Sequence, residues 1–120
     1  MKVFTVVDPI FKTEPLFVIG CTRDELRAYL RKRFRVDATL GNNTTDAGQM
    51  ITFDCVPWRV VWTLKRDPYV LLHELFHLVT RICQDKGIPI RARDERGDFG
   101  DETAAYLFEF FAKKTLRKVL

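Results

Sequence analysis

The sequence predicts a single α+β domain that spans residues 1–120. Four short runs rich in β-branched and aromatic residues have the length of strands, and three longer segments carry apolar residues at helical spacing. Hydrophobic residues make up 47% of the chain, which is enough for one packed core and argues against disorder. A chain of 120 residues is too short to divide that core between two domains.

Two strands and a basic helix are expected in the N-terminal part. Residues 2–7 predict a strand that ends at Asp8-Pro9, and residues 16–21 predict a second strand. Thr22 and Glu25 have the spacing of a capping box, in which two side chains close the start of a helix. The helix that follows has its arginines opposite an apolar face of Leu26, Tyr29, Leu30 and Phe34.

Two more strands are expected after a polar loop over residues 37–48. They are predicted at residues 49–55 and 57–64. Pro57 has no backbone donor, so it suits the first residue of a strand or a strand at a sheet edge.

A long helix is predicted from Pro68 to about residue 86. Asp67 suits its cap, Pro68 its first position and Gly87 its end. Its apolar face consists of Leu71, Leu72, Leu75, Leu78, Val79 and Ile82.

A last helix is predicted from about residue 100 to 118, after a charged loop over residues 91–100. Its apolar face consists of Ala104, Leu107, Phe108, Phe111 and Thr115. A separate stripe carries Glu102, Tyr106 and Glu109.

The two histidines of the chain, His73 and His77, lie outside the apolar face of their helix. With Glu74 they form the pattern H-E-x-x-H, in which two imidazoles bind zinc and the glutamate acts as a base. Residues four apart on a helix share a face, so both rings can reach one ion. We therefore predict His73 and His77 as zinc ligands and Glu74 as the general base. A structural histidine pair is the alternative.

A third ligand is needed, because a catalytic zinc takes three protein ligands and leaves one position for water. With no further histidine, a carboxylate is expected in preference to a thiolate. The downstream candidates are Asp94, Glu95, Asp98, Asp101 and Glu102. We predict Glu102, which opens a helix on the stripe facing away from its core, with Asp98 and Asp101 as the main rivals.

The three cysteines, Cys21, Cys55 and Cys83, show no metal-binding spacing. They are interpreted as small, buried apolar residues.

The two motifs at residues 73–77 and 101–107 resemble those of the gluzincin group of zinc metallopeptidases. In size and in the run from 100 to 111, the chain is most similar to the short zincin-like proteins encoded by bacteriophages and prophages. The resemblance covers roughly residues 58–112. It implies a small, mostly antiparallel sheet with three helices, in which the H-E-x-x-H helix and the C-terminal helix flank the metal site.

The resemblance also implies a zinc-dependent peptidase with Glu74 as general base and His73, His77 and Glu102 as ligands. Tyr106, one turn after Glu102, is expected to stabilise an oxyanion, since no later histidine is present; a packing role is the alternative. Residues 58–64 are expected to form an edge strand that aligns an extended peptide, or else an ordinary sheet edge. The chain lacks the second subdomain of larger family members. This difference counts against the cleavage of large substrates more than it counts against metal binding.

Two other functions are compatible with the sequence. The first is a catalytically weak or inactive metal-binding adaptor that keeps the zincin fold. The second is a nucleic-acid-associated protein that uses the basic first helix. Much of the net charge of +4 lies on that helix, at Arg23, Arg27, Arg31, Lys32, Arg33 and Arg35. A solvated helix face explains these residues more simply, so a nucleic-acid partner is not expected.

The expected partner is a peptide or protein substrate. The chain contains no apolar run long enough for a membrane span and no evident secretion signal. A cytoplasmic location is therefore expected, in the host cytoplasm if the protein is phage encoded.

Overall fold

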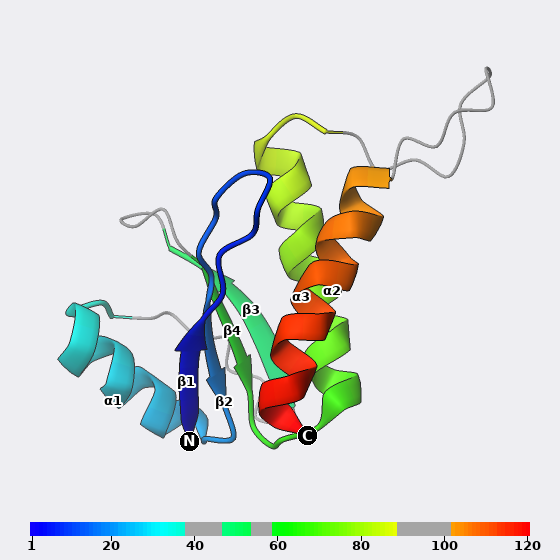
Figure 1. Ribbon diagram of the computed structural model, residues 1–120. Coiled ribbons are helices and arrows are strands. Elements are labelled where there is room, and N and C mark those ends of the chain that lie inside the picture. The colour runs from blue at the N-terminus through cyan, green and yellow to red at the C-terminus, as the bar shows by residue number, and fades with distance from the viewer. Residues whose placement is uncertain (38–46, 54–58, 89–101) are drawn as a thin grey trace.

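The computed structural model describes residues 1–37, 47–53, 59–88 and 102–120. Over these residues the chain forms a four-stranded mixed sheet and three helices (Figure 1). The predicted α+β class is confirmed. None of the described helices is long and apolar enough to cross a membrane.

The sheet has the strand order β1-β2-β4-β3. Strand β1 (Lys2–Thr5) runs antiparallel to β2 (Leu16–Ile19), and β3 (Gly48–Thr52) runs antiparallel to β4 (Arg59–Thr63). The central strands β2 and β4 are parallel. The sheet is therefore antiparallel at both edges and parallel at its centre.

The expectation that residues 58–64 form an edge strand is wrong, because β4 lies between β2 and β3. The run Val60-Val61-Trp62 is almost completely buried, with an exposed fraction of 0% to 1% at each residue. Such a continuous apolar run is typical of a strand that is covered on both faces. The edge strand on this side of the sheet is β3, and Pro57 lies outside the described residues.

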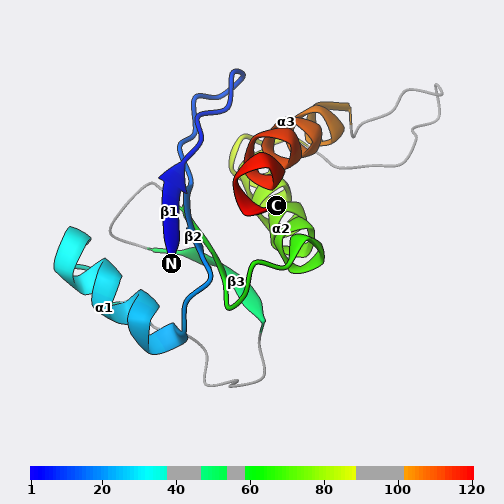
Figure 2. The same ribbon diagram turned by 60° about the horizontal axis from the view of Figure 1, so that its bottom comes forward.

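Helix α1 (Arg23–Phe34) covers one face of the sheet, and α2 (Pro68–Asp85) and α3 (Glu102–Val119) cover the other (Figure 2). Because side chains alternate along a strand, each strand contributes to both layers of the core. Phe17, Ile19 and Val61 pack with the leucines of α2 and with Leu107 and Phe111 of α3. Val18, Val60 and Trp62 pack with Leu26 and Leu30 of α1.

Helices α1 and α2 begin at the capping residues that the sequence predicts, Thr22 and Asp67. On α1, the Thr22 hydroxyl accepts from the Glu25 amide at 3.2 Å, and the Glu25 carboxylate accepts from the Thr22 amide at 3.0 Å. On α2, the Asp67 carboxylate accepts from the amides of Tyr69 and Val70. Gly87, just beyond α2, has a φ of 69°, the left-handed conformation that favours glycine at a helix end.

Cys21 and Cys83 are buried free thiols, as the sequence indicates. Burial raises the pKa of both thiols, which favours their neutral form. Cys55 lies outside the described residues.

Candidate metal centre

The imidazoles of His73 and His77 converge on the exposed side of α2. Their Nε2 atoms are 3.1 Å apart, and the ring centroids are separated by 4.8 Å at an interplanar angle of 77°. The His73 side chain is 69% exposed, so the space in front of the two nitrogens is open to solvent. This placement follows from the sequence, because the apolar residues of α2 face the core and leave the histidines on the other side.

The separation of these two nitrogens fits a shared metal ion. Two nitrogens bound tetrahedrally to zinc at about 2.0–2.1 Å are about 3.4 Å apart. The observed 3.1 Å is close to that value, so a small rotation of either ring is enough. The same distance also fits a hydrogen bond between one protonated and one unprotonated ring nitrogen.

Glu74 lies beside the histidine pair but faces the protein. Its residue is only 7% exposed, and its Oε1 atom is 4.0 Å from Nε2 of His73. A carboxylate oxygen at this distance can contact a water molecule that is held near the imidazole nitrogens. The three residues of the motif therefore occupy one small region, with two exposed nitrogens and one buried acid.

The burial of Glu74 depends on a close approach between α2 and β3 at Gly48. A Cβ atom at this position would lie 2.8 Å from the Trp62 carbonyl oxygen and 2.8 Å from Cγ1 of Val70. It would also lie 3.2 Å from Cγ of Glu74. Only glycine allows this strand to pass so near Glu74. The sequence analysis missed Gly48 because it placed the glycine in the preceding loop.

Replacing Gly48 with alanine should destabilise the protein by about 1–3 kcal/mol, the usual cost of overpacking a tight contact. The melting temperature should fall by several degrees, and zinc affinity should also fall, because the added methyl group pushes against the part of α2 that carries Val70, Glu74 and the two histidines. Thermal unfolding with and without zinc measures both effects.

Gly87→Ala is the matched control for that substitution. Nothing lies within 4 Å of a Cβ atom at Gly87, but its φ of 69° is unfavourable for alanine. We expect the left-handed backbone to lower the free energy of unfolding by about 1 kcal/mol. Zinc affinity should not change. Equal losses of zinc affinity in both variants would contradict a specific role for Gly48.

Glu102 is exposed at the first residue of α3. Among the residues that the structure describes, no three His, Cys, Asp or Glu side chains form a group that could hold a metal ion. The structure thus brings His73, Glu74 and His77 together, and it does not gather Glu102 with the two imidazoles. The third ligand stays a prediction. The rival positions Asp94, Glu95, Asp98 and Asp101 lie outside the described residues.

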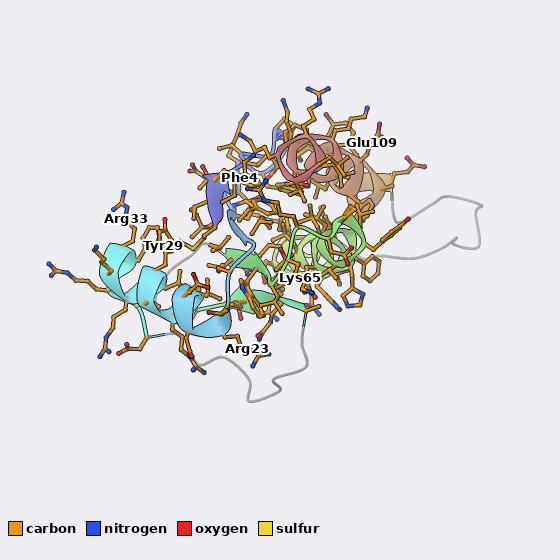
Figure 3. All side chains as sticks on the ribbon, turned by 90° about the horizontal axis from the view of Figure 1, so that it is seen from below. Phe4, Arg23, Tyr29, Arg33, Lys65 and Glu109 are labelled. Carbon is orange, nitrogen blue, oxygen red and sulfur yellow. The ribbon has the colours of Figure 1, made fainter. Side chains whose placement is uncertain are left out.

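Tyr106 is half exposed, at 50%, one turn after Glu102 on α3. Its stripe faces solvent: Glu109 projects from the outer side of the helix (Figure 3) and pairs with Lys113 at 2.7 Å. The role of Tyr106 near an oxyanion stays a prediction.

A groove of about 460 Å³ lies between α2 and β3, next to the motif. Residues 48–50 of β3 form one wall, and Glu74 and His77 belong to the other. The groove therefore connects Glu74 and one imidazole to the sheet edge. The sequence analysis did not anticipate it, since the strand order could not be read from the chain.

Comparison with protein-family models, with curated proteins and with solved structures found no match to this chain.

Proposed function

We propose that this chain is a small zinc-dependent peptidase of the zincin type. The observation that carries the proposal is the geometry of the motif: two Nε2 atoms 3.1 Å apart, with a buried carboxylate oxygen 4.0 Å from one of them. A purely structural zinc is usually enclosed by four protein ligands and needs no base. An exposed pair of nitrogens beside a carboxylate is better suited to a site that admits water and substrate.

His73 and His77 would hold the zinc ion, and Glu102 is the third ligand in this proposal. Bound zinc supplies a water of lowered pKa and polarises the carbonyl group to be attacked. Asp98 and Asp101 are the alternatives for the third position, where a carboxylate is expected in preference to a thiolate because the chain has no other histidine.

Glu74 would take the proton from the attacking water and return it to the leaving amine. Its position supports this role, because it is held between α2 and β3 and cannot swing freely into solvent. A base that is fixed in this way loses little entropy when it meets its proton donor.

The outer edge of β3 would align the substrate, in place of the strand expected from the sequence. The Leu64 amide donates to the Ala47 carbonyl at 2.8 Å, which sets the alternation of hydrogen bonds between β3 and β4. In that register Gln49 and Ile51 bond to β4, while the N–H and C=O groups of Gly48 and Met50 point to the outer edge. An extended peptide can add to these groups as a further strand, beside Glu74 and His77.

Removal of the metal should abolish hydrolysis, and zinc should restore it. The test is a pool of random peptides with blocked termini, incubated with the untagged protein and analysed by mass spectrometry. We expect cleavage with zinc, none after exhaustive chelation, and recovery when one equivalent of zinc is returned. Cleavage that survives chelation, or a zinc-loaded protein that cleaves no peptide in the pool, would contradict the proposal.

A nucleic-acid role for α1 is the second candidate, and one observation favours it. Between residues 23 and 35 the chain has six Lys or Arg and two acidic residues, a net charge of +4. This equals the net charge of the whole chain. The basic helix lies across the sheet from α2 and α3, and Arg23 and Arg33 on it are labelled in Figure 3.

This second candidate predicts oligonucleotide binding that weakens steeply with salt, as expected for phosphate contacts. The variant Arg31→Glu/Lys32→Glu/Arg33→Glu should remove the binding without changing zinc affinity. Fluorescence anisotropy with a labelled oligonucleotide at increasing salt measures the affinity for nucleic acid. A wild-type protein that does not bind at low salt would eliminate this candidate.

A further inference from the structure

The groove between α2 and β3 becomes polar and positively charged as it leaves the metal centre. Beyond His77, the α2 wall continues with Thr80, Arg81 and Gln84. On an ideal helix these residues follow His77 at three, four and seven positions, and therefore stay on its side. Met50 is the large apolar side chain among the residues that line the groove.

The charge of Arg81 is only partly compensated within its local cluster. Its Nε atom lies 3.5 Å from Oδ1 of Asp85, and both side chains are more than 40% exposed. Asp85 also pairs closely with Arg59, whose side chain is only 18% exposed. One carboxylate is thus shared by two guanidinium groups, so Arg81 does not have Asp85 to itself. Because Arg59 is the more buried of the two arginines, solvent screens its ion pair with Asp85 less than it screens the pair between Asp85 and Arg81.

Thr80 adds a second polar group to the same wall. Its hydroxyl is buried, and it has no hydrogen-bond partner in the part of the chain that the structure describes. Of these two residues, Arg81 is therefore the donor that an incoming acceptor can reach, because its side chain is 46% exposed.

We propose that this groove is a subsite that binds a carboxylate of the substrate, with Arg81 as the specificity-determining residue. The inference rests on the proposed function, because it assumes a peptide whose scissile bond lies at Glu74 and His77. Arg81 follows His77 by four residues, which is about 6 Å along the helix axis. An extended peptide rises about 3.3 Å per residue, so the carboxylate lies within two residues of the bond.

The carboxylate has two possible sources, an acidic side chain or the C-terminus of the peptide. A side chain would make the protein an endopeptidase that prefers Asp or Glu near the cleavage point. A terminal carboxylate would restrict cleavage to bonds near the C-terminus of the substrate. Both sources use the same guanidinium group, because arginine binds carboxylates through paired hydrogen bonds.

The test uses peptide hydroxamates, whose hydroxamate group binds zinc and places the following residues in the groove. The residue at the first or second position is Glu, Gln or Lys, and the C-terminus is a free acid or an amide. Affinity is measured by competition on the zinc-loaded full chain. We expect about tenfold tighter binding of one carboxylate source over its neutral counterpart, the typical effect of one charge-assisted hydrogen bond.

Arg81→Glu should reverse the preference, so that the Lys peptide binds more tightly than the Glu peptide. Arg117→Glu makes the same charge change on the last turn of α3, outside the residues that line the groove, and should leave the preference unchanged. Both variants should bind zinc as the wild type does.

The outcomes separate the two proposals. Hydroxamate binding with no preference for a carboxylate, or a preference that Arg81→Glu does not alter, overturns the subsite and leaves the peptidase in place. If no hydroxamate binds to the zinc-incubated protein, the peptidase proposal fails and the subsite fails with it. A preference for the free acid over the amide, with no effect of the Glu side chain, identifies the terminal carboxylate as the source.

Discussion

Glu74→Gln should lower the peptidase rate by about 10²–10⁴-fold, the usual contribution of a general base. The amide has nearly the size and shape of the carboxylate, so it should fill the same space between α2 and β3. It cannot accept the proton of an attacking water. The zinc content and the melting temperature should therefore change little. Initial rates on a cleaved peptide, with metal analysis of the same sample, measure both parts of this prediction.

Glu109→Gln is the matched control, because it makes the same chemical change at an exposed residue of α3 that pairs with Lys113. We expect the rate of this variant to stay within a factor of two of the wild type, since exposed ion pairs contribute about 0–1 kcal/mol. If Glu74→Gln retained the wild-type rate, Glu74 would not be the base. A zinc protein whose activity is absent in both the wild type and Glu74→Gln would instead fit the inactive adaptor.

His73→Ala should weaken zinc binding by more than about 100-fold. Loss of a residue that only supports a metal ligand already lowers metal affinity by about 10–100-fold. His73 would contact the ion directly, so its loss should have a larger effect. The fold should survive, because the side chain is 69% exposed and exposed substitutions usually change stability by less than about 0.5 kcal/mol. Zinc titration against a competing chelator gives the affinity, and circular dichroism gives the stability.

Tyr69→Ala is the control for that substitution. Tyr69 lies one turn before His73 on α2 and is 82% exposed, so its removal should leave zinc affinity unchanged. Zinc uptake by His73→Ala equal to that of the wild type would place the metal elsewhere and remove the basis of the proposed function.

Local features of the fold could be predicted from the sequence because each depends on neighbouring residues. The capping box at Thr22 and Glu25 and the start of α2 at Asp67-Pro68 follow from backbone groups within one turn. The separation of His73 and His77 from the core face of α2 follows from helical spacing alone. For the same reason the H-E-x-x-H motif could be recognised from the sequence.

Features that join distant segments could not be predicted in this way. The position of β4 between β2 and β3 depends on which strands pair. Its continuous apolar run indicates burial on both faces, but it does not identify the strands on either side. The approach of β3 to Glu74 appears only once Gly48 is placed against Val70 and Trp62. The groove with Arg81 depends on the same packing.

The most direct test of the account is a crystal structure of the untagged protein grown with zinc, with data recorded on both sides of the zinc absorption edge. We predict an anomalous peak about 2.0–2.1 Å from Nε2 of His73 and of His77, with a carboxylate oxygen as the third protein ligand. The same map would identify that ligand among Glu102, Asp98 and Asp101. A folded protein that shows no anomalous peak at the two imidazoles would contradict the account.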